Sequence, residues 1–249
     1  MRTVTATRYV TPLREGGSLP ALMEADDDGL YVVKFSGAGQ GPKALVAELV
    51  GGEIGRALGL PVPEIVLVEV DPALGRAEPD PEIRELLQRS SGLNVGLDFL
   101  PGSLAFAPAM DPKPSPQLAA DVIWFDALIT NIDRSPKNPN MLIWHGRPWL
   151  IDHGAALYIQ HTWRDAAAHA RKPFEQIRDH VLLPYSGPLH EADTRLAPQL
   201  EPSVLTAILD LVPDGWLSEP RARYLEYLER RLAVPRPFVE EADRARPAA

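Results

Sequence analysis

The sequence predicts an α+β fold in which a small N-terminal sheet with one helix precedes a larger, mostly helical half. Three observations support this prediction. Strand-like segments are concentrated in residues 1–70, a single helical stripe interrupts them, and helical periodicity dominates from residue 115 onward. Such segregation of strands and helices is typical of α+β proteins, and it leaves a natural cleft between the two halves.

The composition is that of a globular protein and argues against several classes of function. The 249 residues carry 34 acidic and 25 basic side chains, and the net charge of −9 argues against binding to nucleic acid or to an anionic membrane. A phosphate-bearing ligand would need only one local cationic pocket. Cysteine is absent, which excludes disulfides and a cysteine nucleophile. There is no long apolar run and no signal-peptide core, so we expect a cytoplasmic protein.

Strands account for most of the N-terminal half. We expect them at 4–10, 21–25, 30–35 and 65–70, and the run Asp26-Asp27-Asp28-Gly29 predicts a tight turn between the second and the third. The third strand ends on a lysine that shares a face with Leu30 and Val32. That lysine, Lys34, should therefore point toward a rim or a cleft.

One helix interrupts these strands. Pro42 suits its first turn, and Gly59 suits its C-terminal end. The adjacent Gly51 and Gly52 each cost about 1 kcal/mol of helix propensity, which indicates a close approach by another backbone or a ligand, or a local bend. Glu48 lies off the apolar stripe. That stripe is formed by Val46, Val50, Ile54 and Leu58.

Residues 71–92 form a charged insert that leads into a short helix at 81–88. The apolar segment that follows is expected to connect the two halves in extended form. The predicted division of the chain is an N-terminal unit at 1–92, a connector at 93–100 and a C-terminal unit at 101–249.

Helices dominate the C-terminal unit. Ser115 and Pro116 begin one with a clear apolar face, and a hairpin is expected from 141–144 to 149–151 across a tight turn. The tail from Pro235 is charged and is expected to be loosely held. Further helices are expected at 162–171, 172–182, 202–211 and 219–233.

The chemically most informative window lies between residues 131 and 154. A polar loop with Asp133, Asn138 and Asn140 runs into the predicted hairpin, which ends on Asp152. A hairpin brings its two ends together, so Asn140 and Asp152 should lie close in space. Carboxylates and amide oxygens form the oxygen-only ligand set that Mg²⁺ prefers, with positions left for water and phosphate. The window therefore predicts a partial magnesium site.

Two further segments supply a complementary cation. Lys34 at a strand end, held by Glu48 of the helix, would keep an ammonium group aimed at phosphates. Gly17 and Ser18 lie in a glycine-rich turn that would cover phosphates, although an ordinary turn explains them equally well.

Each of these residues also has a simpler interpretation when it is taken alone. Asp133 and Asp152 are explained as turn or cap carboxylates, and Lys34 and Glu48 as solvated side chains. Asp126, within a helix, either supports the loop from behind or is solvated. His153 is expected to pack or to donate a hydrogen bond, and His145 to lie exposed on the hairpin turn.

The order and separation of the motifs favour the functional interpretation, because a kinase active site is built from the same residue types in the same order along the chain. Residues 30–63 and 126–157 resemble the HipA-like kinase family and, more distantly, the protein and phosphatidylinositol kinases. The motifs that carry the resemblance are Val33-Lys34-Phe35, Ala47-Glu48, Leu58-Gly59-Leu60-Pro61-Val62-Pro63, Asn131-Ile132-Asp133-Arg134 with the asparagines that follow, and Ile151-Asp152-His153-Gly154.

The resemblance implies a two-lobed protein-kinase-like fold that binds ATP and Mg²⁺. Lys34 would contact the α and β phosphates, with Glu48 as its ion-pair partner. Asp133 would orient the attacking hydroxyl and accept its proton, and Asp152 would chelate Mg²⁺. The backbone of the connector near 93–100 would hold the adenine.

Two departures from the family pattern matter. The metal-binding asparagine normally lies five positions after the acid and directly before a strand, but here Asn138 meets the first criterion and Asn140 the second. We favour Asn140 because strand register determines geometry more firmly than loop length does. His153 replaces the usual phenylalanine. We also expect the chain to be too short for the extra N-terminal subdomain of the toxin kinase that names the family, so no toxin role is inferred.

The predicted function is ATP- and Mg²⁺-dependent transfer of the γ-phosphoryl group to a hydroxyl. The family favours a protein serine or threonine as acceptor, and a small-molecule hydroxyl, as in antibiotic or sugar phosphotransferases, is the first alternative. A nucleotide sensor without catalysis is the second. A metal-dependent hydrolase that uses His145, Asp152, His153 and Asp133 is the third.

Overall fold

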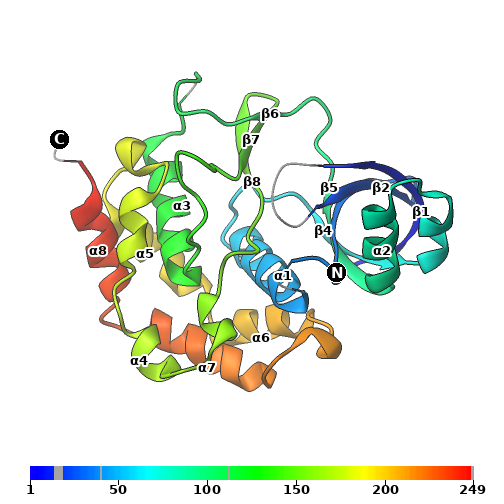
Figure 1. Cartoon of the computed structure of the whole chain (residues 1–249). Helices are drawn as coiled ribbons and strands as arrows, with labels where there is room; N and C mark the ends of the chain where they lie inside the picture. Colours follow the sequence, from blue (N-terminus) through cyan, green and yellow to red (C-terminus); the bar gives the residue numbers. More distant parts are fainter. Residues whose placement is uncertain (14–18, 40, 112, 248–249) are drawn as a thin grey trace.

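The computed structural model describes residues 1–13, 19–39, 41–111 and 113–247 (Figure 1). Its strands are β1 (Thr3–Pro12), β2 (Ala21–Ala25), β3 (Leu30–Lys34), β4 (Ile65–Val70), β5 (Gly92–Asp98), β6 (Leu104–Ala105), β7 (Met141–Trp144) and β8 (Arg147–Leu150). Its α-helices are α1 (Pro42–Ala57), α2 (Pro81–Arg89), α3 (Pro116–Ile129), α4 (Ala166–Ala170), α5 (Leu189–Leu196), α6 (Pro202–Asp210), α7 (Arg221–Leu232) and α8 (Pro237–Ala245). Short 3₁₀ helices are η1 (Pro72–Ala77), η2 (Tyr158–His161), η3 (Glu175–Asp179), η4 (Leu183–Tyr185), η5 (Ala197–Gln199) and η6 (Asp214–Trp216).

The first five strands close into a barrel with the order β1-β2-β3-β5-β4. β1 pairs in parallel with β4, and every other neighbouring pair in the barrel is antiparallel. Alternate side chains point inward, and α2 packs Ile83 and Leu87 against the same apolar cluster, as its position over the barrel in Figure 1 indicates. The strand residues in this cluster are Val4, Ala6, Ala21, Met23, Ala25, Tyr31, Val33, Val66, Val68 and Val70.

Residues 93–100, expected to connect the two halves, lie largely within β5. This strand pairs with β3 on one side and β4 on the other, so it lies inside the sheet. Glycine and asparagine weaken its strand pattern in the sequence. The glycine has a packing reason, because a Cβ at Gly96 would lie 2.6 Å from Cγ2 of Val68.

Helix α1 lies between the barrel and the helical half in Figure 1 and is buried along most of its length. It begins at Pro42, and Gly59 follows its end with a φ of 72°, both as predicted. The unfavourable glycines reflect close packing. A Cβ on Gly52 would overlap Cδ1 of Ile65, and one on Gly51 would lie 3.0 Å from Cβ of His153. Glu48 is fully buried, which contradicts the interpretation that it is solvated.

Helix α3 is the centre of the helical half, with α5 and α8 beside it in Figure 1. It begins at Pro116 as predicted, and the hydroxyl of Ser115 accepts a hydrogen bond from the amide of Leu118 at 3.2 Å. Its side chains are buried from Ala119 to Ile129, so the apolar face expected from the sequence extends around the helix.

The remaining helices differ from the prediction in four places. Only Ala166–Ala170 is α-helical within 162–171, and 172–182 contains the 3₁₀ helix η3 instead of an α-helix. Pro173 and Pro184 bracket that segment and interrupt helical hydrogen bonding. Helix α5 was not predicted. The tail is not loosely held, because α8 packs on α3 and α5, and Phe238 is fully buried.

The predicted hairpin is present and its first strand, β7, has the predicted bounds, but β8 begins at Arg147 and not at 149, so the turn is two residues shorter than expected. Met141 lies opposite Leu150 and Trp144 opposite Arg147. Its turn has φ values of 48° at His145 and 72° at Gly146, the left-handed pair that a two-residue hairpin requires. The amide of Leu150 donates to the carbonyl of Pro61 at 2.7 Å, which links the hairpin to the segment that follows α1.

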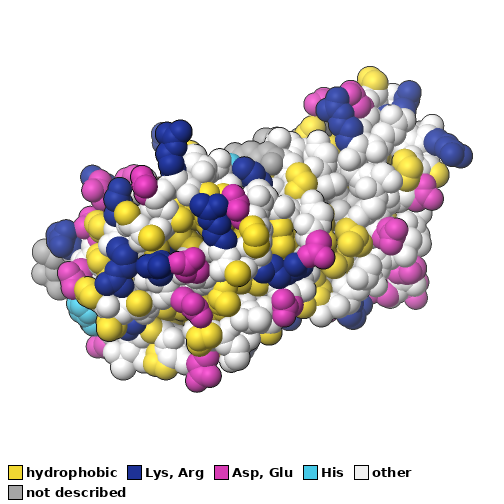
Figure 2. All heavy atoms as spheres, turned by 90° about the horizontal axis from the view of Figure 1, so that it is seen from below, with side chains coloured by type: hydrophobic (Ala, Val, Ile, Leu, Met, Phe, Trp, Pro, Cys, Tyr) yellow, Lys and Arg dark blue, Asp and Glu magenta, His cyan; other side chains and the backbone are white. Residues whose placement is uncertain are grey.

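The surface carries mixed charge. On the face shown in Figure 2, lysine and arginine side chains are interspersed with aspartate and glutamate. Within the described ranges, no helix is both long enough and apolar enough to cross a membrane.

Candidate active site

The ammonium group of Lys34 joins two carboxylates that are distant in the sequence. Its Nζ lies 2.5 Å from Oε2 of Glu48 and 2.5 Å from Oδ1 of Asp152. β3 supplies the lysine, because inward-pointing Tyr31 and Val33 leave Lys34 on the outer face of the barrel. α1 supplies the glutamate, and the segment after β8 supplies the aspartate. These three predicted residues therefore converge.

The three side chains differ in exposure. The side chain of Glu48 is 0% exposed, that of Lys34 is 11% exposed and that of Asp152 is 42% exposed. Burial alone would raise the pKa of Glu48, but the attraction of Lys34 and contact with His153 outweigh it and lower this pKa to about 2. Burial alone would lower the pKa of Lys34, and the two carboxylates reverse this and raise it. Lys34 and Glu48 are therefore both charged.

The loop between α3 and β7 directs two asparagine amides at Asp133. Nδ2 of Asn138 donates to Oδ2 of Asp133 at 2.8 Å, and Nδ2 of Asn140 donates to the backbone oxygen of Asp133 at 2.6 Å. Asn140 is buried, whereas Asn138 is exposed. The hydrogen bonds to Asp133 use the amide nitrogens and leave the amide oxygens of both asparagines out. Because Asn140 is buried, its side chain is held more firmly than that of Asn138.

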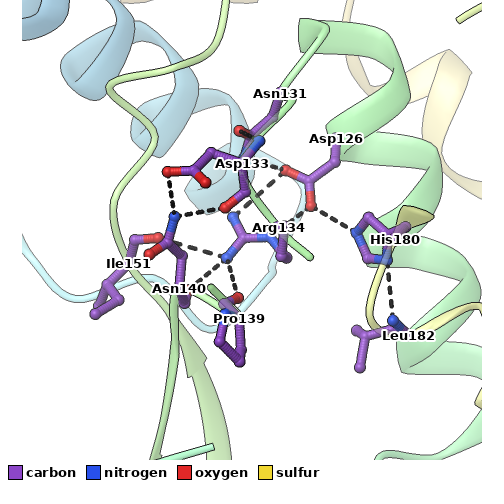
Figure 3. A network of polar contacts seen from close by, with 9 residues as sticks. All are labelled: Asp126, Asn131, Asp133, Arg134, Pro139, Asn140, Ile151, His180 and Leu182. Atoms are coloured by element: carbon purple, nitrogen blue, oxygen red, sulfur yellow. Dashed lines mark hydrogen bonds and ion pairs between the residues drawn. The ribbon is translucent and has the colours of Figure 1, made fainter. Parts of the chain in front are cut away.

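Behind this loop lies a buried ion cluster of Asp126, Arg134 and His180 (Figure 3). Nε of Arg134 lies 2.5 Å from Oδ2 of Asp126, and Nε2 of His180 lies 3.0 Å from the same oxygen. Burial alone would raise the pKa of Asp126, but Arg134 and His180 hold it well below its usual range. Burial lowers the pKa of His180. The solvated alternative for Asp126 is wrong, and the supporting position is confirmed.

Arg134 ties the loop to the hairpin. In Figure 3 its guanidinium group lies between the carboxylate of Asp126 on one side and the backbone of Asn140 and Ile151 on the other. Nη1 donates to the carbonyl oxygen of Asn140, and lies 3.4 Å from that of Ile151. Because Asp152 follows Ile151, one buried side chain sets the separation between the asparagine and aspartate positions.

Three residues around the site adopt left-handed backbone conformations. The φ values are 54° at Thr130, 47° at Asn140 and 57° at Asp152. Such conformations cost of order 1 kcal/mol or more for residues other than glycine and tend to cluster at functional sites. Thr130 ends α3 directly before the loop, and the other two positions carry side chains of the candidate site.

The other predicted positions are distributed as follows. Gly17 and Ser18 lie outside the described residues. His145 is exposed on the hairpin turn, and His153 is buried against Phe125 with ring centroids 5.6 Å apart, as expected for both. The sequence interpretation missed the roles of Arg134 and His180. One signal was available for the cluster, because Asp126 stands alone in the otherwise apolar second half of α3.

The donor atoms suit a hard divalent cation. Asp152 offers a partly exposed carboxylate, and Asn138 and Asn140 offer amide oxygens, so the set consists of oxygen atoms only. In the part of the chain that the structure describes, no group of three or more His, Cys, Asp or Glu is arranged to hold a metal ion.

Comparisons with known proteins agree with this geometry. A model of the family described as HipA-like kinase matches residues 7–232. Among solved structures, the chain is similar to CtkA, a proinflammatory kinase of Helicobacter pylori, with 16% identity, a TM-score of 0.59, and coverage of 98% of this chain and 97% of that one. No curated protein matches the chain.

Two structures of the Golgi casein kinase are also similar, one of them with Mn/ADP bound. Each has 11% identity and a TM-score of 0.51, and the matches cover 98% of this chain and 73% and 71% of those chains. These likenesses show that the protein has a kinase-like fold. Because the family model spans most of its length, the chain belongs to the HipA-like kinase family. It is therefore a kinase.

Proposed function

We propose that this kinase transfers the γ-phosphoryl group of ATP to a hydroxyl group in a reaction that depends on Mg²⁺. Membership of the family favours a serine or threonine of a protein as the acceptor. The observation that carries the proposal is the position of Lys34, whose ammonium group is bonded to a buried carboxylate and to a partly exposed one. Such a cation is fixed in place and is still open to an anionic ligand on one side.

Phosphate binding by Lys34 follows from this asymmetry. Glu48 is fully buried and keeps the ammonium group in position, while Asp152 is open to solvent. The α and β phosphates of ATP would take the side of Lys34 that Asp152 occupies. Asp152 would then be free for the metal ion, and the total charge around Lys34 would remain balanced.

The metal ion would be held by Asp152 and Asn140, with Asn138 as the alternative amide. Asn140 is favoured because it directly precedes β7, is buried, and has its Nδ2 engaged by the backbone of Asp133, which leaves Oδ1 available as a ligand. A Mg²⁺ ion held there would neutralise phosphate charge and help to orient the triphosphate.

Asp133 is proposed as the residue that positions the acceptor hydroxyl. Among the hydrogen bonds of the described residues, the side chain of Asp133 uses Oδ2, which binds Asn138 and lies 3.3 Å from Nδ2 of Asn140. Oδ1 would then accept the proton of the hydroxyl as its oxygen forms a bond to the γ phosphorus. The bond from that phosphorus to the bridging oxygen breaks, and ADP leaves.

The proposed arrangement is two-lobed, with the barrel and α1 on one side of the nucleotide and the helical half on the other. The structure of β5 moves the proposed junction from 93–100 to the residues that follow Asp98, because β5 belongs to the sheet. The adenine ring would lie against that junction.

The alternatives gain less support. A hydrolase built on His145 and His153 would need both rings near the aspartates, but His145 is exposed on a turn and His153 is fully buried. A sensor without catalysis would not need Asp133, which two asparagines hold in place. Assays with both acceptor classes distinguish a protein acceptor from a small-molecule one.

Turnover of ATP tests the proposal. We expect phosphate transfer to a protein substrate or ADP formation with the wild type, and a loss of at least a hundredfold in kcat for Asp133→Asn. Asn140→Ala should lower activity more than Asn138→Ala. Assays with pooled peptides and with aminoglycosides or sugars separate the two acceptor classes. Turnover that is unaffected by Asp133→Asn would refute the assigned role.

A further inference from the structure

His153 occupies a position that is buried and chemically unsatisfied. Its side chain is 0% exposed, and neither Nδ1 nor Nε2 has a hydrogen-bond partner among the described residues. The ring packs edge-on against Phe125. Gly51 of α1 lies so near that a Cβ there would come within 3.0 Å of Cβ of His153. The ring is therefore wedged between α1 and α3.

Glu48 lacks a hydrogen-bond donor for one of its two carboxylate oxygens. Its Oε2 binds Lys34, while its buried Oε1 has no hydrogen-bond partner among the described residues. A buried carboxylate oxygen without a donor carries a substantial free-energy cost. Nδ1 of His153 lies 3.6 Å from this oxygen, slightly beyond hydrogen-bond range. A small rotation of either side chain would satisfy both groups.

We propose that His153 donates a hydrogen bond from Nδ1–H to Oε1 of Glu48 and thereby positions the Glu48–Lys34 pair for nucleotide binding. The imidazole is a positioning residue that acts on the nucleotide through Glu48 and Lys34. Phenylalanine at this position would fill the space without offering a donor. Histidine adds a directional contact that fixes which carboxylate oxygen faces Lys34.

The contact also couples two elements of the site. His153 follows Asp152 directly, and Glu48 lies on α1. While the hydrogen bond holds, a displacement of α1 would also move the segment that carries Asp152. The paired state of Lys34 and the position of Asp152 therefore change together. Gly51 permits this arrangement, because a larger residue would push the ring away.

The kinetic test of this inference rests on the proposed function. We expect His153→Phe to raise the KM for ATP and to lower kcat/KM about tenfold or more, the effect of one lost hydrogen bond to a charged group. His153→Asn should recover most of this loss, because its Nδ2 occupies the place of Nδ1. His153→Gln should not, because its amide reaches the place of Nε2.

Two matched variants sharpen the test. Gly51→Ala should show the same rise in KM as His153→Phe, because it displaces the ring without removing it. His145→Asn, on the exposed turn, should leave the kinetics unchanged. Wild-type values of KM and kcat in His153→Phe, or rescue by glutamine instead of asparagine, would overturn the inference.

A spectroscopic measurement keeps the inference testable if the proposed function fails. Nitrogen-15 NMR of the imidazole in the full-length protein reports which ring nitrogen carries the proton. We expect the Nδ1–H form in the wild type and a shifted Nδ1 resonance in Glu48→Gln. The Nε2–H form, or a His153 spectrum that is insensitive to Glu48→Gln, would refute the contact whether or not the protein turns over ATP.

Discussion

Lys34 is held by two carboxylates of unequal exposure, and this difference separates their contributions to stability. Glu48 is fully buried and is hydrogen-bonded to Lys34 alone among the described residues. Without the ammonium group it would be a buried charge with no compensating partner, which is far more costly than an exposed one. Asp152 would merely become solvated, since its side chain is 42% exposed.

Lys34→Ala is therefore expected to lower the free energy of unfolding by about 3 kcal/mol, as for other broken buried ion pairs. The double variant Lys34→Ala with Glu48→Gln should recover part of this loss, because it removes the unpaired charge. Urea denaturation measures both values. An unfolding free energy for Lys34→Ala equal to that of the wild type would show that Glu48 is not held by Lys34.

The pH dependence of stability follows from the same pair. The pKa of Glu48 is lowered from 4.5 to about 2, so its stabilising contribution is complete above pH 4.5 and is lost as the pH falls toward 2. The wild type should lose up to about 1.4 kcal/mol more per pH unit in this window than Glu48→Gln. Equal slopes for the two proteins in urea titrations would contradict the lowered pKa.

At the level of elements, the loop between α3 and β7 is built around the buried guanidinium group of Arg134. Arg134 is buried, contacts the helix through Asp126 and contacts the hairpin through carbonyl oxygens. Pairing on both sides accounts for a guanidinium group in the interior. The loop is thus fixed from behind, while Asp133 faces the other way toward the two asparagines.

Breaking this cluster is expected to be costly. Asp126→Ala should destabilise the protein by about 3–5 kcal/mol, because the charge of Arg134 remains buried without a partner. The control is Glu85→Ala at the exposed ion pair with Arg89, for which we expect a change of about 1 kcal/mol or less. Thermal or urea unfolding compares the two. Similar small effects would show that the cluster is not the anchor of the loop.

The C-terminal helix α8 gives a separate test of the helical half. Phe238 is fully buried and lies edge-on to Trp124 with ring centroids 5.9 Å apart. Phe238→Ala should cost about 3–5 kcal/mol, the usual range for truncation of a buried phenylalanine. Unfolding measurements on this variant should separate it clearly from Val234→Ala, an exposed neighbour. Equal stability of the two variants would mean that α8 is loosely held.

For the whole molecule, the sequence predicted the strands 30–35 and 65–70, the first long helix, the start of α3 and the first strand of the hairpin correctly, because periodicity and turn residues act locally. It failed where tertiary packing decides. β5 was missed because Gly96 serves the packed interior of the barrel. The tail was misjudged because the charged faces of α8 concealed Phe238 in the pattern.

The candidate site shows the same division. The convergence of Lys34, Glu48 and Asp152 was predicted from ordered motifs and is present in the structure. Glu48 is buried, and Arg134 is bonded on two sides, only because segments distant in the sequence pack together. The pattern of a single sequence does not encode such packing. Only the isolated charge of Asp126 in an apolar helix pointed to the buried cluster.

The most direct measurement is isothermal titration calorimetry of the full-length protein with a non-hydrolysable ATP analogue, with and without Mg²⁺. We expect binding that strengthens at least tenfold with Mg²⁺ in the wild type, and loss of this enhancement in Asp152→Ala. Absence of analogue binding by the wild type, or Mg²⁺-enhanced binding that is unchanged in Asp152→Ala, would contradict a Mg-ATP site at Lys34 and Asp152.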